Sequence, residues 1–399
     1  IRDFLNKKDI LHPQQFGFRP GRSTVQAASA LLMREYESLE NRDCTAIRLY
    51  DLTKAFDLVP HDLLLKKLAH YGFNDSAVAF FKSFLGGWSQ TVVFNGSTST
   101  ATAITCGVKQ GSVLGPTLFL IFANDLAFQF VDGGGEIFLF ADDMSVLASG
   151  ANPISLSDDL SSSNNVIEDW CYANALKLNK EKTQNMKFCL NGRIEGPVNF
   201  LGLQLDNRLS WNFHTDHLHS KLASINFALR RLSSAVSFPV LRMAFFALFM
   251  SRASYMIIMW GNSSKWEMIF KQQKAAVRIM YGLGYAESCR GYFKRLQCLT
   301  IPSLYVFNCI QFVYKNLGLV PRGSDKHKYL TRNRNDLRPP MTRLTNSLRS
   351  NPLQTGVRFF NYLPECIRDL PEKKFVAKLK ALLLNAELYS VSEFFSINF

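Results

Sequence analysis

Hydrophobic and polar positions follow two periodicities along the first hundred residues, one typical of helices and one typical of strands. An apolar stretch covers Val25 to Leu32, a β-type run covers Ala46 to Tyr50, and leucines at helical spacing occupy His61 to Tyr71. The short segment from Arg2 to Lys7 also has a helical pattern. This mixture predicts a fold that combines helices and strands.

Two hairpins are predicted within the first half of the chain. Asn95-Gly96 lies between two β-type runs and is a strong turn signal. The second hairpin follows Gly133-Gly134-Gly135, where Ile137 to Ala141 and Met144 to Ala148 flank only Asp142-Asp143. The tip of this hairpin is therefore predicted to carry two adjacent carboxylates.

From about Trp211 the pattern becomes mostly helical, with basic pairs such as Arg230-Arg231 among leucines and phenylalanines as far as Asn316. Leu317 to Pro340 is rich in Gly, Pro, Arg, Asn and Lys, which fits a solvated linker or a loop along a phosphate backbone. The last segment predicts an amphipathic helix through Phe375, Leu379, Leu382 and Leu383.

The net charge favours a nucleic-acid partner. The 399 residues include 46 Lys and Arg against 32 Asp and Glu, a formal charge of +14, which suits a polyanion better than an acidic membrane face. Phe238 to Trp260 is the most apolar window, but Arg242 and Arg252 interrupt it, so we expect a core helix pair and no membrane partner. We recognise no signal peptide, expect the natural polypeptide to start further upstream, and expect a nuclear and cytoplasmic location.

Cysteine and histidine positions give no metal-binding pattern. The eight cysteines include no Cys-x-x-Cys pair and indicate buried thiols of a reducing compartment. His214, His217 and His219 fall within six residues, but no cysteine is adjacent, so we reject a zinc site there.

Carboxylates are the strongest candidates for chemistry. Asp51 ends the apolar run from Ala46 to Tyr50, where a buried charge is costly unless a positive group meets it. Carboxylates from two adjacent strands can hold the two Mg²⁺ ions, about 4 Å apart, that nucleotidyl transfer uses. Taken singly, Asp51 could instead cap a helix, and Asp142-Asp143 could be an ordinary turn pair.

Four longer motifs surround these carboxylates in a fixed order. They are Gln15 to Thr24, Leu49 to Asp57 followed by Val59-Pro60-His61, Cys106 to Pro116, and Phe140 to Asp143. In composition and order they resemble the fingers motif, the first catalytic motif, the template-side motif and the catalytic turn of reverse transcriptases of non-LTR (LINE-type) retrotransposons.

The resemblance extends over nearly the whole chain. Leu176 to Thr183 and Phe200 to Asp206 look like the later palm and primer-grip motifs, and four segments of the tail are similar to the C-terminal region of the jockey group: Gln272 to Met280, Cys289 to Asn316, Tyr329 to Arg338 and Tyr389 to Phe395. The chain departs from the family at Lys109, where proline is usual, at Phe140, where tyrosine is commoner, and in a short span from Lys187 to Asn199.

The resemblance implies a role for each matching residue. Asp51 and Asp142 would bridge two Mg²⁺ ions, with Mn²⁺ as a substitute, Asp143 as a supporting carboxylate and the Leu52 carbonyl as a candidate ligand. Phe56 would lie under the sugar of the incoming nucleotide and reject ribonucleotides. The remaining implied roles are phosphate contacts for Arg19 and Arg22, contact with the nascent base pair for Gln110 and Gly111, proton donation to pyrophosphate for Lys182, and the primer grip for Phe200, Leu201 and Gly202.

Several of these assignments have a structural alternative. Phe56 would also suit a hydrophobic core, Arg19 and Arg22 a solvated loop, and Lys182 an ordinary surface, while Asp57 is expected to be structural. The implied partners are an RNA template, a DNA primer or nicked target DNA, and dNTPs.

The implied fold class is α+β, a right-hand polymerase with fingers, an antiparallel-sheet palm, a helical thumb and a mostly helical C-terminal region. We expect fingers in residues 1–45, a palm with interleaved fingers elements in 46–210, the thumb in 211–290 and a region of unknown role in 291–399. The implied activity is RNA-directed DNA polymerisation. The alternatives are an inactive or domesticated fragment that binds RNA without catalysis, and an intron-encoded maturase, which would need an intron-binding domain after the thumb.

Overall fold

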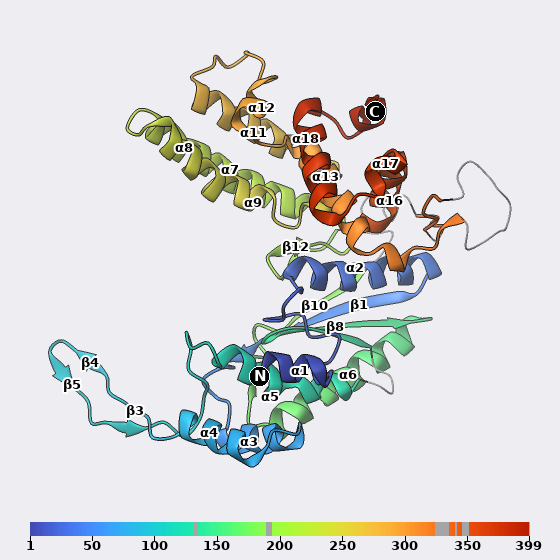
Figure 1. Ribbon diagram of the computed structural model, residues 1–399. Coiled ribbons are helices and arrows are strands. Elements are labelled where there is room, and N and C mark those ends of the chain that lie inside the picture. Colours follow the sequence, from blue (N-terminus) through green and yellow to red (C-terminus); the bar gives the residue numbers. More distant parts are fainter. Residues whose placement is uncertain (131–134, 189–193, 324–334, 340, 345–350, 399) are drawn as a thin grey trace. The chain divides into compact units, whose positions relative to one another are not determined.

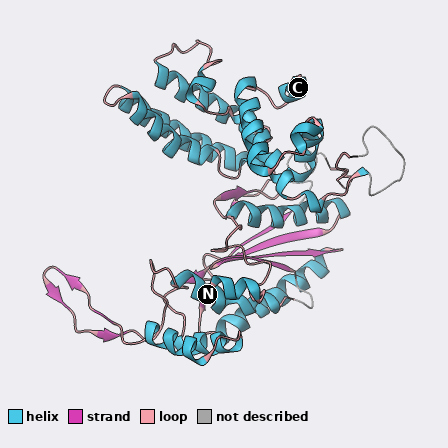
Figure 2. Ribbon diagram, in the orientation of Figure 1, coloured by secondary structure: helices cyan, strands magenta, loops and turns pink. Residues whose placement is uncertain are grey.

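The computed structural model describes residues 1–130, 135–188, 194–323, 335–339, 341–344 and 351–398 (Figure 1). Contacts divide the chain into two compact units, Ile1–Gly192 and Arg193–Phe399, and each is treated by itself below. The first unit combines helices with a sheet, and the second is predominantly helical (Figure 2).

A four-stranded antiparallel sheet forms the centre of the first unit. Its order is β10 (Gln184–Phe188), β1 (Cys44–Tyr50), β8 (Asp143–Gly150) and β7 (Glu136–Phe140). The predicted β-type run from Ala46 to Tyr50 therefore becomes a central strand, with Ala46 and Ile47 fully buried. Because β1 pairs with β8, two segments that are almost a hundred residues apart in sequence lie side by side.

Helices cover both faces of this sheet (Figure 1). Helix α2 (Thr24–Asn41) packs on the face that carries Thr45, and the Thr45 hydroxyl donates to Glu35 of this helix over 2.8 Å. On the opposite face, Leu156 and Leu160 of α6 (Pro153–Ala173) pack on Ala46 and Ala148. Side chains alternate between the faces of a strand, so one apolar strand can hold both helices.

The same core includes α5 (Gly115–Phe128), which contributes an almost continuous run of buried side chains. Around it lie α1 (Arg2–Lys7), α3 (His61–His70) and α4 (Asp75–Leu85), and a two-stranded ladder joins β2 (Leu52–Thr53) to β9 (Lys177–Leu178). An exposed hairpin projects from this unit, with strands β3 (Ser89–Gln90), β4 (Val93–Phe94), β5 (Ser97–Thr98) and β6 (Thr102–Ala103). Its turn is Asn95-Gly96, both with positive φ, which confirms the predicted hairpin.

The second unit begins with the hairpin β11 (Val198–Phe200) and β12 (Leu203–Leu205) and continues as helices. The longer ones are α7 (Asn212–Ser233), α11 (Trp266–Tyr281), α13 (Ile301–Lys315), α16 (Pro352–Tyr362) and α18 (Glu372–Ala386). The shorter ones are α8 (Phe238–Ala244), α9 (Ser251–Ala253), α10 (Ile257–Trp260), α12 (Tyr292–Leu296), α17 (Glu365–Arg368), and the 3₁₀ turns η2 (Leu317–Leu319) and η3 (Ser392–Ser396).

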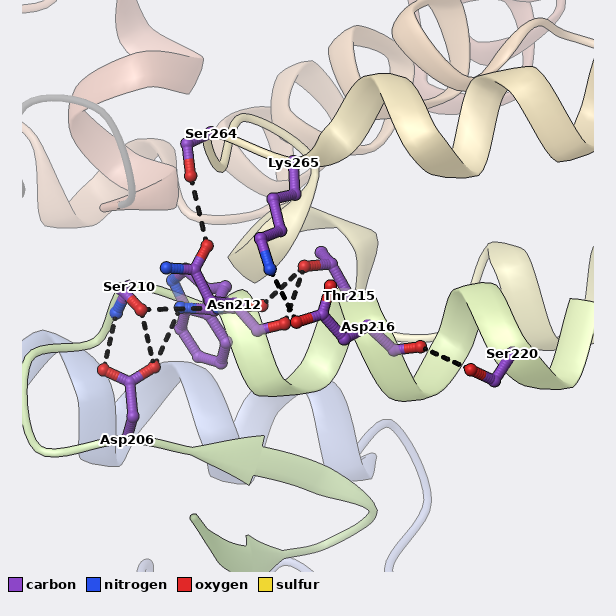
Figure 3. Close-up of polar contacts among 9 residues, drawn as sticks. Asp206, Ser210, Asn212, Thr215, Asp216, Ser220, Ser264 and Lys265 are labelled. Carbon is purple, nitrogen blue, oxygen red and sulfur yellow. Dashed lines mark hydrogen bonds and ion pairs between the residues drawn. The ribbon is translucent and has the colours of Figure 1, made fainter. Parts of the chain in front are cut away.

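A buried aspartate fixes the base of the hairpin to the start of α7 (Figure 3). Asp206 is fully buried, and its carboxylate accepts hydrogen bonds from the backbone N–H groups of Arg208, Ser210 and Trp211 and from the Ser210 hydroxyl. Asp216, in the second turn of α7, forms an ion pair over 2.6 Å with Lys265, which directly precedes α11. A buried carboxylate with this many donors holds the chain in one conformation as it leaves β12.

The apolar window from Phe238 to Trp260 is only partly buried, since Phe238, Val240 and Met243 are exposed, and it is not a simple helix pair. Helix α8 runs into a π-helical segment, η1 (Phe245–Met250), and then into α9, and the one-turn α10 follows Met256, which has a φ of 49°. No helix among the described residues is long and apolar enough to cross a membrane.

Two expectations for the tail are adjusted. Helix α18 confirms the predicted amphipathic helix, but its buried face contains Phe375, Leu379, Leu383 and Leu384, and Leu382 is only half-buried. In the segment from Leu317 to Pro340, residues 324–334 and 340 lie outside the described part. The described ends pair with each other, because the N–H of Gly323 donates to Asp336 and that of Arg338 to Pro321.

Candidate active site

The predicted carboxylate hairpin exists, with its turn shifted by one residue. Phe140 pairs with Asp143, so the two turn residues are Ala141 and Asp142, and Asp143 is the first residue of β8. The expectation that Asp142-Asp143 forms the tip is therefore wrong in register. Ala141 has a φ of 58°, a left-handed conformation that sequence propensity alone would not assign to alanine.

Asp51 lies beside this turn. The pairing of β1 with β8 continues to Tyr50 opposite Met144, so Asp51 is the next residue beyond that pair, on the side of Asp143. Its backbone carbonyl accepts a 2.8 Å hydrogen bond from the N–H of Asn179, which anchors the strand end. The sheet therefore brings together the three carboxylates that the sequence singled out.

The three carboxylates influence one another electrostatically. Burial raises the pKa of Asp142, and the charge of Asp51 adds to this rise. Burial also raises the pKa of Asp143, with further contributions from Asp142 and Asp51. Like charges held in a partly desolvated place disfavour ionisation, and a nearby cation would reverse that effect.

Gln15 and Gly17 hold the turn in its conformation, and sequence reasoning assigned neither a role. The fully buried Gln15 accepts hydrogen bonds through Oε1 from the N–H groups of Gly17, over 2.8 Å, and Ala141, over 3.1 Å. A Cβ at Gly17 would overlap the backbone N of Ala141. The motif from Gln15 to Thr24 was the available signal, but only the fold shows that it contacts the turn at Ala141-Asp142.

Phe56 lies in the first unit's core, at its boundary. Its ring stacks on Phe119, with centroids 4.5 Å apart, and meets the Phe18 ring edge-on at 6.4 Å. It remains partly accessible, whereas Leu52 is buried in the ladder with β9. Phe56 therefore packs against the core, as its structural alternative predicted. Part of the side chain is still accessible to a ligand.

The two loop arginines differ in their contacts. Arg19 donates through Nη1 to the carbonyl of His12 over 2.8 Å, with longer contacts to the carbonyls of Leu11 and Gln15. Arg22 lies with its guanidinium over the Phe16 ring, 5.1 Å from the centroid. Arg19 thus supports the loop, and the solvated-loop alternative does not describe it.

The remaining residues of the first unit lie as follows. Lys182 reaches Asp51, with 3.5 Å between Nζ and Oδ2. Gln110 and Gly111 are exposed, Gly111 has a φ of +80°, and Gln110 donates to Asp57 over 2.9 Å. Lys109, where the family usually has proline, lies over the ring of Trp88. Because β10 pairs with β1, Lys182 just before β10 lies next to Asp51 just after β1.

Phe200, Leu201 and Gly202 belong to the second unit, where they form the end of β11 and the turn to β12. Leu201 and Gly202 both have positive φ, as a two-residue hairpin turn requires. Tyr255 fixes this turn, because its hydroxyl donates to the Leu201 carbonyl over 2.7 Å. Nothing in the local sequence around Tyr255 indicates this contact, which joins residues 54 positions apart.

The donor set of the carboxylate site fits a divalent cation. Among the described residues, no group of three or more Asp, Glu, His or Cys side chains is arranged so that it could hold a metal ion. Three carboxylates near one another, two of them with raised pKa, nevertheless provide the hard oxygen donors that Mg²⁺ and Mn²⁺ prefer. The three histidines lie on α7, and burial lowers the pKa of His214 to about 4.

The comparison with protein families identifies this chain. The family described as reverse transcriptase (RNA-dependent DNA polymerase) matches residues 1–205, just over half of the 399 residues. The chain therefore belongs to the reverse transcriptase family, and its α+β fold class is that of the right-hand polymerases, as expected. Enzymes of this family use divalent metal ions, in keeping with the carboxylate donors.

Relatives from fruit-fly transposons confirm the resemblance to jockey-like non-LTR elements. The chain is 29% identical over 259 residues to the probable RNA-directed DNA polymerase from transposon BS of Drosophila melanogaster, covering 59% of this chain and 28% of that protein. It is 29% identical over 222 residues to the RNA-directed DNA polymerase from the mobile element jockey of the same species, covering 51% of this chain and 24% of that protein. The matches thus span about a quarter of these relatives.

Telomerase is among the similar solved structures. The telomerase of Candida tropicalis in complex with a TWJ fragment of telomeric RNA aligns with 99% of this chain and 54% of its own, at 13% identity and a TM-score of 0.44.

Proposed function

We propose that this chain is the catalytic part of an RNA-directed DNA polymerase, which transfers nucleotides from dNTPs to a primer 3′ hydroxyl on an RNA template. The observation that carries the proposal is the pairing of β1 with β8, which puts Asp51 beside the turn that holds Asp142. Membership of the family and the net charge of +14 support it further.

Asp51, Asp142 and Asp143 would hold two Mg²⁺ ions, for which Mn²⁺ could substitute, with the Leu52 carbonyl as a further ligand. When bound, such ions activate the primer hydroxyl and stabilise the charge that develops on pyrophosphate. Lys182, whose Nζ lies 3.5 Å from Oδ2 of Asp51, would give a proton to the leaving group. The carboxylates lie close together without a metal only at an electrostatic cost, which metal binding would remove.

The other residues would bind and select substrates. The exposed edge of Phe56 would lie under the sugar and exclude a 2′ hydroxyl, while Gln110 and Gly111 would face the nascent base pair. Arg22, and the part of Arg19 not engaged with backbone carbonyls, would contact phosphates. Phe200, Leu201 and Gly202 would position the primer.

We extend the proposal to the whole protein in three respects. The primer is a DNA end, such as nicked target DNA, and the protein acts in the nucleus and the cytoplasm. Fingers correspond to residues 1–45, the palm with interleaved fingers elements to 46–210, the thumb to 211–290, and 291–399 form a region of unknown role. The rival function is RNA binding without catalysis.

Primer extension tests the proposal directly. A DNA primer on an RNA template is extended with Mg²⁺ and dNTPs by the wild type, by Asp142→Ala, and by the control Asp158→Ala. Asp158 is an exposed carboxylate on α6, which begins after the far end of β8, so its loss removes the same charge away from the turn.

We expect Asp142→Ala to lower extension by about 10³-fold or more and Asp158→Ala to extend normally, because metal-held charge supplies several kcal/mol of transition-state stabilisation. Equal extension by the wild type and Asp142→Ala would eliminate the site. RNA binding without extension by any of the three proteins would establish the rival function.

A further inference from the structure

The loop that carries Gln110 is attached to the chain segment that follows Asp51. Three hydrogen bonds make the attachment: the N–H of Val108 donates to the Phe56 carbonyl over 2.8 Å, the N–H of Gly107 donates to the Val59 carbonyl over 2.7 Å, and the His61 ring lies 2.8 Å from the Gly107 carbonyl. The two segments are about fifty residues apart in sequence. Because of these bonds, the position of Gln110 depends on the same chain that carries the first catalytic carboxylate.

Gly107 allows the two segments to approach each other closely. Its φ is +93°, and a Cβ at this position would lie 2.7 Å from the backbone oxygen of Asp57, closer than real Cβ atoms come to such an atom. Only glycine avoids both the conformational cost and this overlap. Gly107 thus packs directly against the backbone of Asp57.

At this point Gln110 donates from Nε2 to Oδ1 of Asp57 over 2.9 Å. An ionised carboxylate can only accept hydrogen bonds, so the amide must turn its NH₂ group to Asp57. The Oε1 atom of Gln110 then points away from Asp57. The carboxylate therefore determines which half of the amide is available to a ligand.

We propose that Asp57 is a positioning residue that fixes the amide of Gln110, so that Gln110 presents a hydrogen-bond acceptor to the incoming nucleotide and its template partner. This inference rests on the proposed polymerase function and deepens it: the site recognises a hydrogen-bond donor of the substrate at Gln110. Without Asp57 the amide rotates freely and presents its NH₂ group as often as its oxygen. Asp57 itself touches no substrate and acts only through Gln110.

The side chains of Asp57 and Gln110 are both exposed, so a substitution can change how Gln110 is oriented without destabilising the fold. Removal of a solvent-exposed hydrogen bond opens no cavity and leaves no buried polar group unpaired. We therefore expect Asp57→Ala to unfold within about 2 °C of the wild type, while substrate recognition changes. Asp62→Ala is the matched control, because Asp62 is an exposed aspartate five residues away, in the first turn of α3.

The test measures kcat and KM for single dNTP addition to a DNA primer on an RNA template. Asp57→Ala is expected to raise KM for the dNTP by roughly 3- to 10-fold with a smaller change in kcat, the size of one lost hydrogen bond. The same substitution in a Gln110→Ala background is expected to have no further effect, since its target is absent. Asp62→Ala should match the wild type in both parameters.

A swapped pair gives the rescue. In Asp57→Asn/Gln110→Glu the asparagine NH₂ can donate to the glutamate, so the pair keeps one hydrogen bond, one negative charge and an acceptor that faces outward. We expect a lower KM for this double variant than for either Asp57→Asn or Gln110→Glu alone. Additive effects of Asp57→Ala and Gln110→Ala, or a swapped pair no better than its single variants, would overturn the positioning role.

Primer extension by the wild type distinguishes failure of the polymerase function from failure of the positioning role of Asp57. A wild type that extends primers while Asp57 acts independently of Gln110 refutes the inference and leaves the polymerase function standing. A wild type that extends no primer refutes the function, and the inference with it.

Discussion

Glu35 is a fully buried carboxyl group that packs on the four-stranded sheet of the first unit, and it makes the stability of this unit depend on pH. It accepts a hydrogen bond from Thr45 of β1, while its Oε2 has no partner among the described residues. Burial raises its pKa from 4.5 to about 8, and the Thr45 bond opposes this rise only partly. The folded state therefore keeps Glu35 protonated at neutral pH, whereas the unfolded chain ionises it.

The sign and the size of the effect follow from these two pKa values. Because the folded pKa is raised, the contribution of Glu35 to stability is fully present below about pH 4.5 and is lost as the pH rises toward about 8. The difference corresponds to about 5 kcal/mol as an upper limit, or about 1.4 kcal/mol for each pH unit in this window. Glu35→Gln keeps the size of the side chain and the acceptor for Thr45, and it removes the titration.

The pH dependence is measured by urea unfolding of the wild type and of Glu35→Gln. The pH values run from 5 to 8 in steps of about one unit. The advantage of the variant in unfolding free energy should grow steadily as the pH rises. Glu37→Gln is the control, since Glu37 is exposed on the same helix and pairs with Arg34. A difference between the wild type and Glu35→Gln that stays constant with pH, or an equal slope for Glu37→Gln, would refute the reasoning.

Three further predictions concern the turns and the metal site. Gly17→Ala should cost about 1 to 3 kcal/mol of unfolding free energy and slow primer extension by about 10-fold or more, because its Cβ overlaps the backbone N of Ala141; Gly196→Ala, where a Cβ meets nothing within 4 Å, is the control in both assays. Asp142→Asn should stabilise the metal-free protein by up to about 1 kcal/mol through loss of repulsion, and should abolish the rise in Tm that saturating Mg²⁺ gives the wild type; an unchanged rise would contradict it. Tyr255→Phe should lower the free energy of unfolding by about 1 kcal/mol, because it removes the hydrogen bond to the Leu201 carbonyl. If the turn at Leu201 positions the primer as proposed, KM for the primer–template should rise more than KM for the dNTP. Equal changes in both would argue against primer positioning by this turn.

Local patterns in the sequence predicted most of the elements. The apolar run from Ala46 to Tyr50, the leucines of α3 and the Asn95-Gly96 turn each gave the correct structure, because short-range chemistry determines them. The resemblance to a known family predicted which carboxylates would meet. Strand pairing in the structure agrees, since Asp51 lies next to the Asp142 turn.

Contacts between distant segments were beyond sequence reasoning. Gln15 to Ala141 and Tyr255 to Leu201 join residues 126 and 54 positions apart. Their side chains, an amide and a phenol, have no local pattern that specifies a partner. The π-helical segment within the apolar window was missed for a related reason, since helical periodicity cannot distinguish i+4 from i+5 bonding over six residues.

The one-residue error at the Ala141-Asp142 turn has a physical cause. Placing Asp142 and Asp143 at the tip would remove the left-handed φ of Ala141, and local preference therefore favours that turn. It would also pair Ala141 with Met144 in place of Leu139 with Met144, which slips β7 against β8 by two residues and changes every cross-strand pair, although each side chain keeps its face of the sheet. Two hydrogen bonds from outside the hairpin hold the present arrangement, because the N–H of Leu139 donates to the Gln14 carbonyl and the N–H of Ala141 donates to Oε1 of Gln15.

These contacts favour the left-handed turn, and several unfavourable features lie around it. Besides the φ of Ala141, the buried Nε2 of Gln15 lacks a partner among the described residues, and two carboxyl groups have raised pKa values. Strain of this kind persists only where the surrounding structure outweighs it. A cation bound by the carboxylates would relieve the repulsion between them, which is the part of this cost that the pKa shifts of Asp142 and Asp143 express and that needs no movement of the backbone.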